Sequence, residues 1–460
     1  MSSNELPQRL HWLRGRVSSH VTGWKRNAGF LKSIAILASA TALGHVISLV
    51  SMPVITRLYS PADFGLQAGL SSLFALLLVV AAGKYDQAIV LSEDDDDAIN
   101  LAAVALLVSI LICCALGLVV WTSSDLMARQ VGVPKLAGYL WLLPWTLFAG
   151  SLAAIFTGWH LRRKAYPHVA RQMLEFHSFQ ALAQVGFGLL HLAPLGLLLG
   201  ELCGRAASIA IQARGMWNQT SPRLSAITFP GMWRQACAHS RFPFVAAPSA
   251  LLNVLVIALP PFFLLRYYGE TVAGLYFAGN RLAAAPITML GSAVANVFYS
   301  ELASHQHDLE GNRQRFNALT SQLTLMALGI LPFLLSAPWW VGPLLGEQWA
   351  EAGVLMAVLA PLVLGRLIVS PLSQTYYVYG KQHVLLVLDA VRAGLIVAVF
   401  TLSHLANLSL TACLLTFSLG MAGLYVFHCL AIANILKNAA IPNLPFQLKT
   451  VSSAQGAGHG

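Results

Sequence analysis

Hydrophobic and polar positions alternate along this chain in long blocks, and each hydrophobic block is about as long as a membrane crossing. A helix needs about 20 apolar residues to cross the hydrocarbon core of a bilayer. The connections between the blocks are mostly short and polar. The pattern predicts about 12 transmembrane helices, at 33–55, 65–84, 99–121, 136–158, 172–190, 193–214, 241–265, 272–299, 318–340, 350–372, 383–403 and 409–435.

Composition strengthens this prediction. Of the 460 residues, 57 % are hydrophobic and 10 % are charged, whereas soluble domains contain about 45–50 % apolar and about 25 % charged residues. So large an apolar excess has no aqueous core to fill and must face lipid. We therefore expect an all-α integral membrane protein, and we exclude secreted, cytosolic and disulfide-built folds.

The charged residues indicate an orientation. Lys and Arg resist translocation and collect in cytoplasmic segments. With both termini inside, the cytoplasmic segments hold 20 Lys and Arg residues and the opposite side holds four. This asymmetry favours an even number of spans with both termini in the cytoplasm. The membrane also accounts for the net charge of +10, so we expect no nucleic-acid partner.

A short element occurs twice in the sequence. Shifting the chain by 209 residues superposes four identical pairs, Arg57 and Arg266, Tyr59 and Tyr268, Gly65 and Gly274, and Leu66 and Leu275. Both copies connect an odd-numbered span to the next, where glycine permits a tight turn and Arg and Tyr suit the headgroup zone. We interpret the element as structural.

The repeat predicts two six-helix halves, an arrangement typical of secondary transporters with a binding site between the halves. The expected organisation comprises a basic cytoplasmic segment 1–32, an N-terminal lobe 33–214, a cytoplasmic linker 215–240, a C-terminal lobe 241–435 and a cytoplasmic tail 436–460.

Two oppositely charged pairs fall inside predicted spans. Glu201 and Arg205 are four residues apart, and Asp389 and Arg392 are three apart, so each pair can share one helix face. A charged side chain near the bilayer centre costs about 2.5–3.5 kcal/mol on insertion scales and usually marks a pathway or has a partner. For both arginines, a role in holding helices together stays open beside a binding role. The two acids are candidates for ion coupling by proton exchange.

Two further intramembrane arginines, Arg281 and Arg366, have no local partner. Arg281 lies about nine residues inside its span, hence about 14 Å deep. Counting the two pairs, four arginines against two acids leave an excess of two positive charges. The planar guanidinium matches phosphate oxygens with two hydrogen bonds. We therefore predict an anionic headgroup such as a diphosphate as ligand, bound by Arg281, Arg366, Arg392 and Arg205.

The first copy of the repeated element also carries a family resemblance. The residues Arg57-Leu-Tyr-Ser-Pro-Ala-Asp-Phe-Gly65, followed by Lys84-Tyr-Asp-Gln-Ala-Ile-Val-Leu91 and a run of acids, resemble the start of Wzx-type polysaccharide flippases. These belong to the multidrug/oligosaccharidyl-lipid/polysaccharide (MOP) exporter superfamily. The resemblance implies a MATE-like fold with two lobes around a central cavity, alternating between inward-open and outward-open states.

The same resemblance implies a substrate and a location. The substrate would be an undecaprenyl-diphosphate-linked oligosaccharide repeat unit, moved from the cytoplasmic to the periplasmic leaflet of the bacterial inner membrane for O-antigen, capsule or exopolysaccharide synthesis. Arginines lining the cavity would bind the diphosphate. A polysaccharide polymerase and a chain-length regulator are the protein partners that this function implies.

Two other functions stay open. A cation-coupled multidrug antiporter of the same superfamily should carry excess acid in its cavity. A membrane-embedded glycan polymerase or ligase usually builds its site on a large extracytoplasmic loop, and the longest expected here is 122–135. The chain contains no Walker A, HExxH or GxSxG motif and no Cys/His spacing typical of metal ligands. We therefore expect a transporter without catalytic residues, cofactor or metal.

Overall fold

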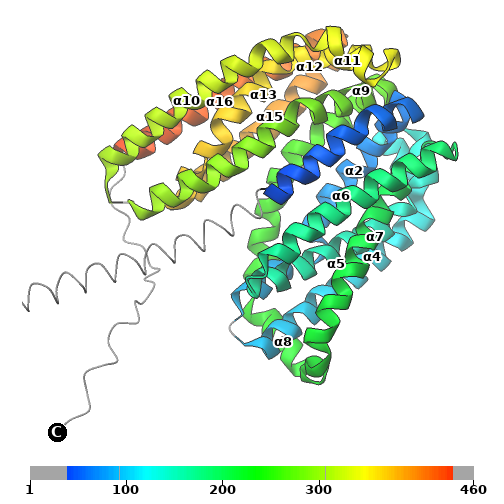
Figure 1. The fold of residues 1–460 in the computed structure, drawn as a ribbon, viewed down its shortest axis with the longest axis vertical. Helices are drawn as coiled ribbons and strands as arrows, with labels where there is room; N and C mark the ends of the chain where they lie inside the picture. Colours follow the sequence, from blue (N-terminus) through cyan, green and yellow to red (C-terminus); the bar gives the residue numbers. More distant parts are fainter. Residues whose placement is uncertain (1–38, 93, 306, 439–460) are drawn as a thin grey trace, which may run out of the picture.

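A computed structural model of the chain describes residues 39–92, 94–305 and 307–438, and every regular element within these ranges is helical. The expected segment 1–32 and nearly all of the expected tail lie outside the described residues. Figure 1 shows two groups of helices, which we call the N-terminal and the C-terminal bundle.

The N-terminal bundle begins with the helix Ser39–Leu58. It continues with α2 (Pro61–Ala81), α3 (Tyr85–Ala88), η1 (Ile89–Leu91), α4 (Asp95–Val131), η2 (Pro134–Tyr139), α5 (Leu142–Arg162), α6 (Tyr166–Leu189) and α7 (Leu195–Thr220). The stretch that follows holds η3 (Ser221–Ala226), α8 (Phe229–Ala238) and η4 (Phe242–Ala246), and α8 packs on α4.

The C-terminal bundle begins with α9 (Ala247–Ser304), which leaves helical geometry at Gly269. It continues with α10 (Leu309–Leu335), α11 (Ala337–Leu345), η5 (Glu347–Trp349), α12 (Ala350–Val358), α13 (Ala360–Leu372), α14 (Gln374–Val378), α15 (Gln382–Leu405) and α16 (Leu410–Asn438).

The chain turns back on itself within α9. Asn253 and Asn280 line the same cavity, although 27 residues of straight helix would separate them by about 40 Å. The turn lies at Gly269, with φ 88° and ψ 177°, a backbone conformation that is essentially restricted to glycine. The single element α9 therefore contains two helices, which correspond to the expected spans 241–265 and 272–299.

The number of helices that could cross a membrane, judged by length and composition, is smaller than the twelve expected. Nine helices in the described residues are long and apolar enough to cross a membrane, and the bent pair α12 and α13 brings the number to ten. The difference has two causes. The two helices of α9 count as one candidate span, and α6, which carries the buried glutamines Gln172, Gln180 and Gln184, is not among the candidates. Helices occupy all twelve expected positions, but the count of twelve crossings is not confirmed.

The two bundles meet at one end, where α2 packs along α9 (Figure 1). A Cβ atom added to Gly65 would lie 1.9 Å from the Glu270 carbonyl oxygen, and one added to Gly274 would lie 1.8 Å from the Pro61 carbonyl oxygen. The shift of 209 residues converts Pro61 into position 270 and Gly65 into position 274. The two contacts are therefore equivalent under the repeat, and we call this region the convergent end.

Further contacts hold the bundles together at the convergent end. The Trp349 indole donates to the Thr56 carbonyl oxygen at 2.8 Å, and the Thr56 hydroxyl donates to the Leu345 carbonyl oxygen at 2.9 Å. Lys135 and Glu270 form an ion pair of 3.0 Å, and hydrogen bonding to Glu270 raises the pKa of the Lys135 ammonium group. Trp349 and Thr56 are fully buried, so the hydrogen bonds between them and to Leu345 are removed from solvent.

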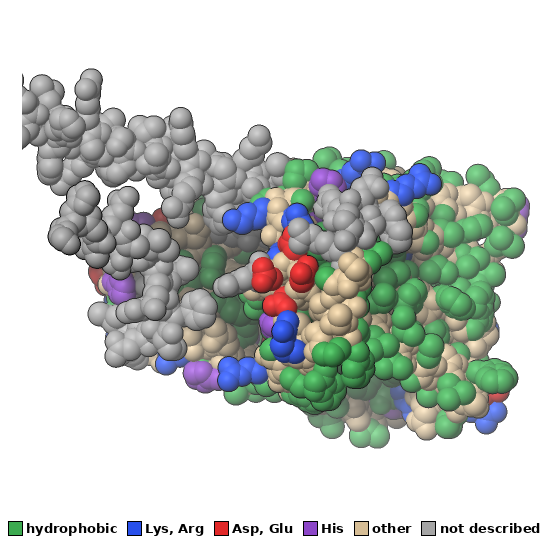
Figure 2. Space-filling view, turned by 90° about the horizontal axis from the view of Figure 1, so that it is seen from below, with side chains coloured by type: hydrophobic (Ala, Val, Ile, Leu, Met, Phe, Trp, Pro, Cys, Tyr) green, Lys and Arg blue, Asp and Glu red, His purple; other side chains and the backbone are tan. Residues whose placement is uncertain are grey.

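The outer surface is suited to lipid. Figure 2 shows one face on which hydrophobic side chains predominate, while acidic side chains gather with Lys and Arg in a compact group. Asp95 at the start of α4 pairs with Arg162 and Arg163 at the end of α5, and Asp97 pairs with Arg234 on α8. Acids at the first turn of α4 also complement the helix dipole.

Candidate functional site

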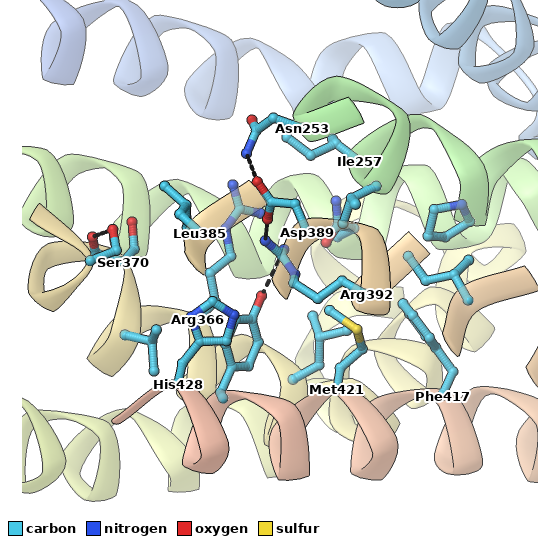
Figure 3. A pocket seen from close by; sticks show the side chains of 18 of the residues that line it. Asn253, Ile257, Arg366, Ser370, Leu385, Asp389, Arg392, Phe417, Met421 and His428 are labelled. Atoms are coloured by element: carbon cyan, nitrogen blue, oxygen red, sulfur yellow. Dashed lines mark hydrogen bonds and ion pairs between the residues drawn. The ribbon is translucent and has the colours of Figure 1, made fainter. Parts of the chain in front are cut away.

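The charged residues predicted inside the membrane form two clusters rather than one. The first surrounds a cavity of about 290 Å³ within the C-terminal bundle. Helices α9, α13, α15 and α16 supply most of its wall, and α14 contributes Gln374 and Tyr377. Figure 3 shows Arg366, Asp389 and Arg392 converging on this space.

A chain of hydrogen bonds fixes one wall of the cavity (Figure 3). The Asp389 carboxylate accepts from Asn253 at 3.1 Å and from the Arg392 guanidinium at 2.8 Å. Arg392 also donates to the Tyr425 hydroxyl at 3.4 Å and lies over the Tyr425 ring. Asp389 is 4 % exposed, and a buried carboxylate requires such partners. Hydrogen bonds therefore hold this wall in place, and its charge is close to neutral.

Arg366 brings an uncompensated charge to the same cavity. In the part of the chain that the structure describes, its side chain forms no ion pair and no hydrogen bond with another residue. The neighbouring lining groups Asn280, Gln374 and Tyr377 likewise form no side-chain hydrogen bond with the described residues. These side chains leave donors and acceptors available to a ligand.

His428 is a further unsatisfied group of the lining. It is 2 % exposed, yet neither ring nitrogen has a hydrogen-bond partner in the described residues. Buried polar groups without a partner are uncommon in native proteins. Its position at the cavity points to a partner that arrives with the ligand or with water.

The second cluster lies in the N-terminal bundle. The Glu201 carboxylate accepts from Arg205 at 2.8 Å and from the Ser71 hydroxyl at 3.3 Å. The Arg205 guanidinium lies 4.2 Å from the centroid of Phe74 and 4.8 Å from that of Phe176. Ion pairing and the faces of two aromatic rings thus stabilise this arginine within the membrane region.

Arg281, on α9 of the C-terminal bundle, adds a third charge near the second cluster. It interacts electrostatically with Glu201 on α7, with His177 on α6 and with His45 on Ser39–Leu58. The His45 and His177 rings lie 5.8 Å apart. Arg281 forms no ion pair within 4.0 Å with any described carboxylate. Its charge is therefore placed between the bundles and only partly compensated.

The structure thus separates the predicted site residues. Arg366, Asp389 and Arg392 share the C-terminal cavity, whereas Glu201 and Arg205 pair within the N-terminal bundle, where Arg281 of the opposite bundle interacts electrostatically with Glu201. Sequence reasoning missed the polar partners of both groups. Asn253 and Asn280 could have been singled out from the sequence. An amide side chain within an apolar run is unfavourable in lipid and therefore indicates a polar partner or a cavity. Among the described residues, no group of three His, Cys, Asp or Glu side chains is placed to hold a metal.

Comparison with solved structures defines the class of protein first. An inward-facing multidrug resistance MATE transporter of the MOP superfamily matches with a TM-score of 0.69, at 12 % identity over 88 % of this chain and 100 % of that one. An outward-facing MATE transporter gives 0.58, at 14 % identity over 88 % and 95 %. A MOP transporter from Pyrococcus furiosus gives 0.61, at 16 % identity over 88 % and 96 %. The fold is that of MOP transporters.

Sequence comparison then places the chain within this class. Residues 54–354 match the family described as polysaccharide biosynthesis protein, and the chain belongs to that family. It is 27 % identical over 368 residues to a succinoglycan biosynthesis transport protein of Rhizobium meliloti, covering 77 % of this chain and 68 % of the relative. The protein is therefore a multi-pass membrane transporter. It is of the Wzx type within the MOP superfamily, as the sequence predicted.

Proposed function

We propose that this protein is a flippase for an undecaprenyl-diphosphate-linked oligosaccharide repeat unit. It carries the unit from the cytoplasmic to the periplasmic leaflet of a bacterial inner membrane during surface polysaccharide synthesis. The lipid tail stays in the bilayer while the headgroup crosses between the bundles. A polymerase and a chain-length regulator act on the product.

The position of Arg281 carries this proposal. Two ion pairs, Glu201 with Arg205 and Asp389 with Arg392, are each neutral. The positive charges of Arg281 and Arg366 are therefore left in excess. Of these two, Arg281 lies between the bundles, where a headgroup must pass. A guanidinium in a region of low dielectric binds a diphosphate with charge-assisted hydrogen bonds. The same excess of positive charge would repel a cationic drug.

Alternating access is the mechanism that fits this fold best. The bundles are joined at the convergent end, where α2 packs along α9 around Gly65 and Gly274. The excess of basic residues in the expected cytoplasmic segments supports a periplasmic convergent end and cytoplasmic termini. Transport then requires the contacts around Gly65 and Gly274 to open.

The two candidate acids for ion coupling differ in their surroundings. Asp389 is held within one bundle by Asn253 and Arg392. Glu201 interacts with Arg281 of the opposite bundle as well as with Arg205, so its partners change when the bundles move. We assign ion coupling to Glu201. Glu201→Gln should abolish the dependence of transport on a proton gradient, and unchanged gradient-driven transport would exclude this role.

The experiment that tests the flippase uses cells lacking the protein. Single repeat units on polyprenyl diphosphate should accumulate there, protected from a label confined to the periplasm. The wild-type protein should relieve the accumulation, and Arg281→Gln should reduce transport about tenfold or more, the value of a charge-assisted hydrogen bond. Arg313→Gln, which removes a half-exposed arginine, is the matched control and should transport normally.

Two other outcomes would replace the proposal. Repeat units that accumulate but react with the periplasmic label would identify a polymerase or ligase, because the lipid would already have crossed. Absence of any accumulation, together with increased sensitivity to cationic drugs, would identify a multidrug antiporter. Both outcomes contradict a flippase.

A further inference from the structure

The cavity in the C-terminal bundle has a chemistry of its own. We infer that it binds the sugar portion of the substrate, as a subsite separate from the diphosphate site around Arg281. This inference rests on the proposed function, because it names what the second of the two charged clusters recognises. The ligand class is an oligosaccharide, bound through hydroxyl groups.

The two clusters face different directions from neighbouring residues. Asn280 lines the C-terminal cavity, whereas Arg281, the next residue on α9, is absent from its lining and interacts electrostatically with Glu201, His45 and His177 of the N-terminal bundle. Successive residues of a helix point about 100° apart. One helix therefore presents an anion-binding group to the space between the bundles and an amide to the cavity, so a single headgroup can reach both.

The cavity lining matches hydroxyl groups better than phosphate. Sugar hydroxyls donate and accept hydrogen bonds, and the unpaired groups of Asn280, Gln374 and Tyr377 supply both functions. The Asp389 carboxylate keeps lone pairs beyond its bonds to Asn253 and Arg392. A sugar hydroxyl can donate to them, whereas an ionised phosphodiester has no proton to donate.

Preorganisation and shape support the same ligand class. The wall from Asn253 to Tyr425 is held by hydrogen bonds among its own side chains, and such preorganisation lowers the entropic cost of binding. Three tyrosines, Tyr276, Tyr377 and Tyr425, line the cavity, and Tyr377, whose side chain is half-exposed, is the one available to stack on a sugar ring. The volume of about 290 Å³ lies near the lower end of ligand sites, which suits part of a repeat unit.

Arg366 and His428 complete the subsite. Docking a sugar here removes water from the Arg366 guanidinium, which then needs acceptors to replace that water. Ring and hydroxyl oxygens of a sugar provide them, and a hydroxyl can likewise bond the buried nitrogens of His428. The groups that lack partners in the protein are thus those that a sugar would satisfy.

The test compares two ligands on the full-length protein in nanodiscs. Undecaprenyl diphosphate is offered bare, and again carrying the repeat unit of the strain's own polysaccharide. The wild type should bind the glycosylated lipid more tightly. Asn280→Ala combined with Gln374→Ala should weaken that binding about tenfold, as expected for two hydrogen bonds, and leave binding of the bare lipid unchanged. Arg281→Gln should weaken both, and Arg313→Gln neither.

Each other result has a defined meaning. Equal losses of affinity for both lipids in the cavity variant would assign the cavity to the diphosphate and overturn the inference. Unchanged affinity for both lipids would also overturn it. If the wild type bound both lipids equally, the sugar subsite would be excluded while the flippase stands. If it bound neither lipid, the proposed function itself would fail. Tyr377→Phe, which removes one hydroxyl from a half-exposed ring, repeats the test should the double variant not fold.

Discussion

Asp389 and Arg392 illustrate how a charge is kept inside this membrane protein. Asp389 accepts hydrogen bonds from Arg392 and Asn253 and is 4 % exposed. Taking away one member of such a buried pair leaves an uncompensated charge, which costs more than the pair itself contributes. The sequence left open whether this pair has a structural role. Such a role predicts a measurable loss of stability when one partner is removed.

Asp389→Asn should destabilise the protein by about 3–5 kcal/mol, because Arg392 loses its counter-charge within the bundle. The measurement is thermal unfolding in detergent, followed by tryptophan fluorescence. The double variant Asp389→Leu with Arg392→Met removes both charges and should unfold at a higher temperature than the single variant. A single variant as stable as the wild type would contradict the assignment.

At the scale of elements, the turn inside α9 depends on one glycine. Gly269 adopts φ 88° and ψ 177°, and a Cβ added there would meet no atom within 4 Å. Substitution therefore changes backbone conformational energy without a steric clash.

Gly269→Ala should lower stability by about 1–3 kcal/mol, the cost of holding a residue with a side chain in this region. Gly394→Ala on α15 is the control, since a Cβ there also meets nothing within 4 Å but the backbone is helical. It should be neutral or stabilising by about 0.5–1 kcal/mol. Equal unfolding temperatures for the two variants would show that the turn is not strained by a side chain.

The sequence predicted the positions of these elements better than their character. Hydropathy located α4 and α15 because their lipid-facing surfaces are apolar. It did not show that α4 begins at Asp95 and continues past a break in helical geometry at Ser123 to Val131. The expected span 350–372 is bent by 55° between α12 and α13, where Pro361 lacks the amide hydrogen that a continuous helix needs.

The site was harder to predict than the fold. Residue spacing identified both ion pairs, because partners three or four positions apart share a helix face. It could not assign Arg281 and Arg366 to different clusters, since that depends on how α9 turns between two bundles. The aromatic partners of Arg205 come from α2 and α6, far from it in sequence, and no local pattern reports such contacts.

At the scale of the molecule, the repeated element lies where the bundles touch. Gly65→Ala and Gly274→Ala should each prevent closure of the convergent end, because the new methyl group would overlap a backbone oxygen of the opposite bundle. Spin labels on Gly138→Cys and Thr271→Cys, read by double electron–electron resonance in a background without other cysteines, should show longer distances in both variants than in the wild type.

The control for this experiment is Gly423→Ala on α16, where an added Cβ meets nothing within 4 Å, and its distances should equal those of the wild type. Because the two glycine contacts are equivalent under the repeat, the two variants should shift the distribution to a similar extent. A shift in only one of them would show that the bundles do not close symmetrically.

The contacts of the convergent end also determine how strongly its closure depends on salt concentration. Salt weakens exposed ion pairs strongly, but it hardly affects buried uncharged hydrogen bonds. Here the uncharged bonds of Thr56 to Leu345 and Trp349 predominate, and Lys135 with Glu270 is the exposed ion pair. If this end faces the periplasm, whose ionic strength follows the surroundings of the cell, its closure should be nearly independent of external salinity.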